Sequence, residues 1–499
     1  MTKKITLITV VIALGVAAAL FAGGSKDRGA VPAESSAITY GIPTQPDHLD
    51  PYEATSADSR FILFNLFEGL FKPAPDGRLI PAVAASYSSS ADFLTWTIKL
   101  KDSVYFHNGN RVTAADVVYS LNRAAEKKLY GLQSISGIET PDPSTVIIRL
   151  SEADPEFYYY LTNAVIPAGY EGQNTAPVGT GPFKFVSFTP QYELVLEKFG
   201  SYWQPDLPRA QKLVFKIKAD YNSVMLDLKA GSLNAGTIDT TSVQQLDQSQ
   251  FSIIYEKINM VQIFCLNNAY APLRDPRVRQ AISYAVDVDE IIALAHNGQA
   301  VRAATPVIPA LSYAYNKDCE GSYPVNLEKA RALMAEAGYA GGFTLEITQP
   351  SVYQPHIDTA QVIINQLAKI GIKGSIKLVD WPTWLSEVYT DRKYQGTVIS
   401  IDGVTLSPRS FLFRYESKDP QNFMNYSNAE FDRLYAATLR TVSEAERIGA
   451  YKKMQEIVVR DAASVFICDL FAPRVFKKNI TGFQGYPLSV FDASLLKVD

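Results

Sequence analysis

The chain has 499 residues. This length exceeds what a single hydrophobic core usually serves, so two or three domains are predicted. Its 47 Lys and Arg nearly balance 51 Asp and Glu, and no basic block occurs, which argues against nucleic-acid binding. The 28 Tyr and 25 Phe include rigid rings of the kind that suits a binding cleft, although most are expected to be half-buried packing residues.

The N-terminus reads as a secretory signal peptide over residues 1–24. Lys3 and Lys4 precede an apolar run, and the small residues 22–25 follow it. An uncleaved membrane anchor is the alternative, but the run is marginal for a span of about 20 residues and is interrupted by Thr and Gly. Residues 25–37 are rich in Gly, Ala, Pro, Ser and charge, which predicts a flexible leader.

The stretch from Asp92 to Arg123 predicts a strand, a short extended run, a turn and a capped helix. Apolar and polar residues alternate over 94–100, the period of a half-buried strand. Residues 104–110 are an extended run closed by Asn-Gly-Asn. Thr113 can then cap a helix, and Asp116 answers it at the third helical position.

Other blocks of the chain carry similar strand and helix-start signals. Residues 261–268 read as a strand, and Asp275 followed by Pro276 predicts the start of a helix. Two further capping boxes are predicted to begin at Ser427 and at Ser443.

These blocks, in this order, resemble one large family. The motifs are F-H-N-G followed by T-A-A-D-V-V-Y-S in the first stretch, G-T-G-P-F at 179–183, and R-V-R-Q-A-I-S-Y-A-V-D at 277–287. They are similar to those of the extracytoplasmic solute-binding proteins of peptide-type ABC transporters, family 5, which include dipeptide- and oligopeptide-binding proteins. The resemblance spans essentially all of the mature chain. Relatives are often lipoproteins, but Gly23 stands where their lipidated Cys would be, so a periplasmic protein without a lipid anchor is expected.

The resemblance implies an α/β fold of the periplasmic-binding-protein type, with two lobes, a hinge and an additional α/β domain on lobe I. The hinge is expected to be crossed near Asn267 and near Pro473. The expected division is lobe I from 38–55, 180–268 and 474–499, the extra domain from 56–179, and lobe II from 269–473. The implied partners are a small solute or peptide and the permease subunits of an ABC transporter with a separate ATPase. A monomer is expected.

Catalytic chemistry is not indicated by the sequence. No G-x-S-x-G elbow, P-loop or H-E-x-x-H occurs, and the four His are scattered without metal-ligand spacing. We therefore expect no enzyme activity, no cofactor and no metal. The three Cys are far apart, and at least two are expected to be small buried residues, although one disulfide stays open.

Specificity is predicted to lie in the segment 401–409. Family peptide binders hold the ligand's ammonium with a carboxylate in a W-x-G-D-x-x-D-P-like segment, because a buried cation needs a charged partner. Here the two acids become Val404 and Ser407, and Asp402 is the carboxylate left, either to bind an ammonium or to cap a turn. This departure puts a standard dipeptide ligand in doubt.

Further candidate ligand contacts come from loops that the family turns toward its ligand. Arg409 could meet a carboxylate with two parallel hydrogen bonds. Trp384 and Asn268, by contrast, are expected to be packing residues. The remaining candidates are Asn267, Tyr353, Trp381, Asn425 and Tyr426.

Three functions agree with these observations. Peptide or oligopeptide uptake by lobe closure comes first. Uptake of a non-peptide solute, such as an oligosaccharide or an opine-like compound, is the alternative, since the lost acids favour neutral ligands. A ligand-sensing or assembly role for the same cleft is the third.

Overall fold

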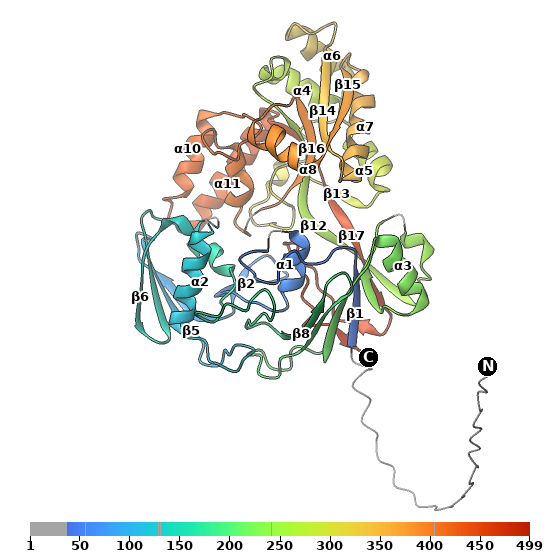
Figure 1. The fold of residues 1–499 in the computed structure, drawn as a ribbon. Helices are drawn as coiled ribbons and strands as arrows, with labels where there is room; N and C mark the ends of the chain where they lie inside the picture. Colours follow the sequence, from blue (N-terminus) through green and yellow to red (C-terminus); the bar gives the residue numbers. More distant parts are fainter. Residues whose placement is uncertain (1–36, 55, 128, 130, 241, 404) are drawn as a thin grey trace, which may run out of the picture. The chain divides into compact units, whose positions relative to one another are not determined.

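The computed structural model describes residues 37–499, except positions 55, 128, 130, 241 and 404. The predicted signal peptide, the predicted leader up to residue 36, and Val404 lie outside these described residues. The described part of the chain belongs to one compact unit. Its secondary structure mixes helices with strands of four sheets (Figure 1).

The main sheet has eleven strands, and its order departs strongly from the chain order (Figure 1). Strand β13 (Ala300–Arg302) pairs only with β17 and lies off the main path. From one edge to the other the path is β15 (Lys373–Val379), β14 (Thr344–Pro350), β16 (Gly396–Ile401), β12 (Phe251–Leu266), β17 (Ser464–Lys477), β11 (Ala235–Thr237), β1 (Ala37–Ile42), β10 (Lys212–Ile217), β9 (Glu193–Lys198) and β8 (Phe183–Thr189).

Strands β12 and β17 are long enough to serve both halves of this sheet. They pair antiparallel along their length, while β12 pairs with β16 at one end and β17 pairs with β11 at the other. Their register shifts between Lys257 and Val261, where Asn259 adopts a left-handed backbone with φ 58°. This irregularity interrupts the ladder between the two halves. Pro473, one of the two predicted hinge positions, pairs with Tyr255, just before this register shift.

The half that contains β12, β14 and β16 is a three-layer α/β arrangement. Alternate residues of β12 face different cores: Val261 and Ile263 pack with α10 and α11, whereas Phe264 packs with α4 to α7. A strand that is covered on both faces has a nearly continuous apolar sequence. The run that predicts a strand at 261–268 is of this kind. The helices are α4 (Pro276–Ala285), α5 (Val288–His296), α6 (Leu327–Glu336), α7 (Gln354–Ala368), α8 (Trp381–Thr383), the π-helical turn η7 (Trp384–Thr390), α9 (Arg409–Leu412), α10 (Ala429–Thr438) and α11 (Glu444–Arg460).

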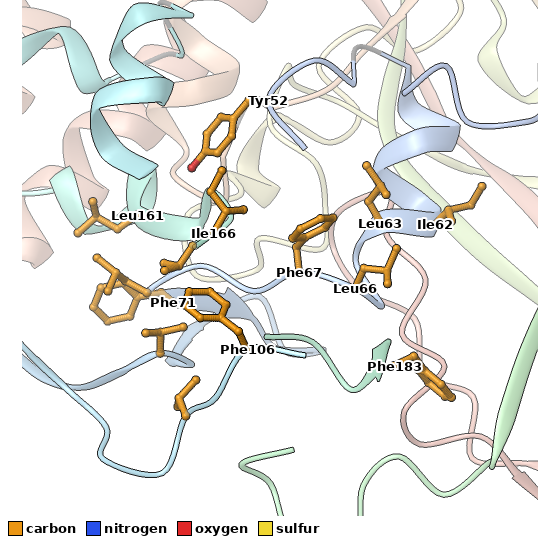
Figure 2. Packing of buried hydrophobic residues seen from close by; sticks show 14 of the residues in the cluster. Tyr52, Ile62, Leu63, Leu66, Phe67, Phe71, Phe106, Leu161, Ile166 and Phe183 are labelled. Carbon is orange, nitrogen blue, oxygen red and sulfur yellow. The ribbon is translucent and has the colours of Figure 1, made fainter. Parts of the chain in front are cut away.

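The other half shares its core with the segment that follows β1. One buried cluster joins residues of β1 and β10 to α1 (Ala57–Leu63) and to residues 66–71, and Figure 2 shows Phe67, Phe71 and Phe183 within it. Helix α3 (Tyr221–Ala230) covers a separate small cluster.

The smaller sheets belong mainly to residues 71–150. A four-stranded sheet is covered by α2 (Ala114–Glu126), which makes contacts with its strands β6 and β7. The strands are β4 (Ala84–Ser89), β5 (Thr95–Leu100), β7 (Thr145–Leu150) and β6 (Ile135–Asp142); two-stranded pairs form from β2 (Phe71–Pro73) with β3 (Leu79–Pro81) and from β18 (Ile480–Thr481) with β19 (Lys497–Val498).

Most of the predicted local signals are confirmed. Trp96 and Ile98 are buried on β5, and Thr113 and Asp116 form the predicted capping box of α2. The extended run within 104–110 is reduced to one bridge between Tyr105 and Arg111. 

Two of the other helix starts are also as predicted. Asp275 caps α4 and Ser443 caps α11. The predicted cap at Ser427 is wrong, since Asn428 accepts the N–H bonds at the start of α10. Both residue types cap well, so the sequence alone did not separate them.

Candidate functional site

The segment after β16 carries the candidate specificity residues. It leaves the sheet where Ile401 pairs with Val261, next to the register shift of β12. A Cβ at Gly403 would lie 2.3 Å from the ring of Phe411, so only glycine fits there. The segment therefore turns tightly against the first turn of α9.

Asp402 is the carboxylate that this turn leaves available. Its side chain is partly exposed, and its backbone carbonyl accepts a hydrogen bond from Arg414 Nη1 at 3.2 Å. No described residue forms an ion pair or hydrogen bond with the carboxylate. The geometry leaves this group able to bind a cation, and whether it does so stays a prediction.

Ser407 and Arg409 have internal partners instead. Both are buried, and the Arg409 guanidinium donates to the Asp154 carboxylate at 2.8 Å. The Ser407 hydroxyl donates to Glu156. These bonds join the specificity segment to a part of the chain about 250 residues earlier, and ligand contact by the two residues stays a prediction.

Tyr353 and the two tryptophans form one aromatic row. The Tyr353 ring meets Trp381 edge-on with centroids 5.4 Å apart, and Trp381 stacks on Trp384 at 5.1 Å and 6°. Trp384 is 3% exposed and its indole N–H donates to Thr397 Oγ1, in agreement with the predicted packing role. Tyr353 and Trp381 remain accessible at the solvent end of the row.

The carboxylate of Asp58, in helix α1, acts on this row. Burial and the negative charge of Asp58, in the first turn of α1, raise the pKa of the Tyr353 phenol. Burial and the same carboxylate raise the pKa of Tyr221 at the start of α3. One carboxylate thus acts on both phenols. Asp58 and Tyr221 could not be picked out from the sequence, because they carry no local signal beyond their helix-start positions.

Asn267 and Asn425 are brought together, but in a different cluster. Asn425 Nδ2 donates to Asn267 Oδ1 at 2.9 Å, and Asn267 Nδ2 donates to the backbone carbonyl of Tyr394. Tyr426 is buried and donates to Asp461. These contacts fasten loops at the end of β12, and a ligand role for the three residues stays a prediction.

Two buried histidines lie behind the aromatic row. His356 packs edge-on against Tyr353 and its Nε2 lies 3.0 Å from Ser400 Oγ, while His296 Nε2 lies 3.1 Å from Gln262 Oε1. Burial lowers the pKa of each imidazole to about 4, so both are neutral at physiological pH.

All three cysteines are buried and free, in agreement with the expectation of small packing residues. In the part of the chain that is described, no group of three or more His, Cys, Asp or Glu is arranged to hold a metal ion. No helix of the described residues has the length and apolar character needed to cross a membrane.

The chain is similar to known extracellular solute-binding proteins. The family model described as bacterial extracellular solute-binding proteins, family 5 Middle, matches residues 78–423. The glutathione-binding protein GsiB of Pectobacterium atrosepticum is 30% identical, over 96% of each chain.

Solved structures are similar over most of the chain. AgaA of A. tumefacien R10, in complex with agropinic acid, has a TM-score of 0.76 and 28% identity, covering 93% of this chain and 99% of AgaA. The ABC transporter substrate-binding protein CtaP of Listeria monocytogenes has a TM-score of 0.83 and 26% identity, with coverage of 93% and 99%. The predicted fold class, a periplasmic-binding-protein α/β fold, is confirmed.

Proposed function

This chain belongs to family 5 of the bacterial extracellular solute-binding proteins, and from that premise we propose that it captures a short peptide with a free ammonium group and delivers it to an ABC permease. The observation that carries the ligand assignment is the Asp402 carboxylate. It is partly exposed, it has no partner among the described residues, and it is the carboxylate left in the segment that carries the ammonium-binding acids of family peptide binders, two positions before the first of them.

Three other side chains support this ligand class. Asp58 adds a second negative charge near Tyr353, and the rings of Tyr353 and Trp381 supply apolar surface for a peptide's side chains. The relative GsiB is named a glutathione-binding protein, and glutathione is a tripeptide with a free ammonium.

The proposed mechanism is capture by closure. Solute that contacts both lobes stabilises the closed arrangement by its differential affinity for that state. Closure excludes water, which strengthens the ion pair between Asp402 and the ammonium. The permease would then recognise the closed form, and a separate ATPase would supply the energy of transport.

The domain division and the location of the protein are part of the proposal. Lobe I would comprise 38–55, 180–268 and 474–499, the extra domain 56–179, and lobe II 269–473. The hinge would be crossed near Asn267 and near Pro473, and the register shift of β12 lies close to the second crossing, since Pro473 pairs with Tyr255. The protein would act as a periplasmic monomer after removal of residues 1–24.

The test is calorimetric titration of the mature protein with trialanine and with its N-acetylated form. Wild type should bind the free peptide at least tenfold more tightly, since a charge-assisted hydrogen bond contributes about 1.5–3 kcal/mol. Asp402→Asn should remove this preference, whereas Asp391→Asn, which changes an exposed aspartate bound to Lys393, should keep it. Equal wild-type affinity for the two peptides would exclude the ammonium site.

An opine-like solute is the second candidate. Ser407 replaces a family acid and its hydroxyl is used by Glu156, so this segment presents less negative charge than a peptide binder's. AgaA, at 28% identity, was solved with agropinic acid. A thermal-shift comparison decides between the candidates: agropinic acid should raise the melting temperature more than trialanine or glutathione if this second candidate holds.

A further inference from the structure

A buried group of charged and hydroxyl side chains connects the specificity segment to residues 154–160. Its members, here called the Arg409 cluster, come from residues 154–156, from η3 (Phe157–Thr162), from residues 407–409 at the start of α9 and from α11. Arg409 is 2% exposed and Glu156 4%. The cluster consists of Asp154, Glu156, Tyr160, Ser407, Arg409, Arg447 and Tyr451.

Arg409 is held from one side by two groups. Its Nη2 lies 2.8 Å from each oxygen of the Asp154 carboxylate and donates to the Tyr160 hydroxyl at 2.6 Å. Its Nη1 is buried and has no hydrogen-bond partner among the described residues. The guanidinium therefore depends on the nearby carboxylates for its stabilisation, since a buried cation without them is costly.

Glu156 accepts hydrogen bonds from two segments that lie far along the chain. It accepts from the Tyr451 hydroxyl at 2.7 Å and from the Ser407 hydroxyl. The Nε atoms of Arg409 and Arg447 lie 3.7 and 3.6 Å from its carboxylate oxygens. Two cations thus face two carboxylates, and removal of one charge would leave another uncompensated in a region of low dielectric.

The segment that begins with Arg409 also contacts the chain at Asp402, where Arg414 Nη1 donates to the Asp402 backbone carbonyl at 3.2 Å. Ser410 Oγ donates to the backbone carbonyls of Thr405 and Ser407, both at 2.7 Å. Gly403 packs directly against the ring of Phe411. A displacement of Arg409 would therefore move Phe411 and Arg414, which contact Gly403 and the Asp402 carbonyl.

We propose that Asp154, Glu156 and Arg409 are positioning residues for solute binding, which set the affinity of the site by fixing the segment 405–414 that contacts Asp402 and Gly403, without touching the solute. This inference rests on the proposed function, because it requires Asp402 to face the solute. A site with a fixed segment binds more tightly because less conformational freedom is lost on binding.

The chain supplies a matched control in Glu68. This second buried glutamate accepts from the Tyr202 hydroxyl at 2.6 Å and pairs with Lys72 at 2.9 Å, as Glu156 pairs with Tyr451 and arginine. Its side-chain partners lie at residues 72 and 202–203, outside the segment 405–414. Glu68→Gln should lower stability as Glu156→Gln does, but only the latter should disturb the site.

The experiment measures affinity and backbone exchange in Glu156→Gln, Asp154→Asn and Glu68→Gln. The probe is glutathione or trialanine, whichever binds wild type more tightly, at a temperature where every variant is folded. Glu156→Gln and Asp154→Asn should weaken binding about tenfold or more, mainly through faster dissociation, while Glu68→Gln stays within about twofold. Hydrogen–deuterium exchange of the peptide 405–412 should increase in the first two variants only.

The outcomes separate this inference from the proposed function. Affinities of Glu156→Gln and Asp154→Asn that match Glu68→Gln would overturn the positioning role. If wild type binds neither probe, the proposed peptide function fails, and the exchange of 405–412 then decides: an unchanged rate in both variants overturns the inference, and a selective increase supports it. Should Glu156→Gln not fold, Asp154→Asn alone decides, since that side chain is partly exposed and less costly to change.

Discussion

Replacing Asp469 with asparagine should flatten the pH dependence of folding above pH 4. Asp469 lies on β17 beside the register shift of β12, and it is 0% exposed. One carboxylate oxygen accepts from the Met260 N–H at 3.4 Å, and the other has no partner among the described residues. Burial raises the pKa of this carboxyl from 3.8 to about 7, against the opposing effect of the neighbouring N–H groups and Lys257.

The size and sign of the effect follow from linkage. Because the folded state holds the proton more tightly, wild type has the full stability of the neutral carboxyl below pH 3.8 and loses it as pH rises through about 7. The difference between the two pKa values corresponds to about 4 kcal/mol, of which about 3 kcal/mol falls between pH 5 and pH 8. An asparagine has no such titration.

Urea unfolding at pH 5, 6, 7 and 8 measures this difference. The free energy of unfolding of Asp469→Asn relative to wild type should rise by about 3 kcal/mol over that range. Asp142→Asn is the control, because the hydrogen bonds of Thr145 and Ser144 lower the pKa of Asp142 to about 2, below the range tested. A difference between Asp469→Asn and wild type that stays constant with pH would refute the reasoning.

Other substitutions test the aromatic row, the turn and the buried histidines. Trp384→Ala should lower the free energy of unfolding by about 3–5 kcal/mol in denaturant, the cost of removing a buried tryptophan. Trp381→Ala should weaken trialanine binding about fivefold in a titration, since aromatic contacts contribute about 0.5–1.5 kcal/mol, and an unchanged affinity would take Trp381 out of the site. Gly403→Ala, whose Cβ would collide with Phe411, should cost about 1–3 kcal/mol of stability and reduce solute affinity; a fully stable variant would contradict the tight turn. His296→Gln should reduce the stability lost as pH falls from 6.5 to about 4, because burial lowers the pKa of the folded imidazole, and an unaltered acid transition would contradict this.

Local signals in the sequence predicted local structure well. The alternation over 94–100 and the pair Thr113 and Asp116 each depend on neighbours within a few residues, and the structure contains both elements. The family motifs likewise predicted the fold class, which the similar structures confirm.

Long-range partners could not be predicted in this way. In the structure the Arg409 guanidinium pairs with Asp154, which lies 255 residues earlier, and no spacing rule connects the two residues. The effect of Asp58 on the Tyr353 phenol is hidden for the same reason, since no spacing rule connects these two residues either. Charge alone marks such residues as candidates, and only tertiary packing determines whether the partner is a solute or another side chain.

The most direct test of the central claim is identification of the solute that the protein carries in its native compartment. The mature protein would be isolated from its own bacterium without denaturation, and the bound solute would be released by unfolding and identified by mass spectrometry. We expect a short peptide with a free ammonium group, absent from a parallel preparation of Asp402→Asn. A sugar or an opine-like compound, retained equally by wild type and Asp402→Asn, would contradict it.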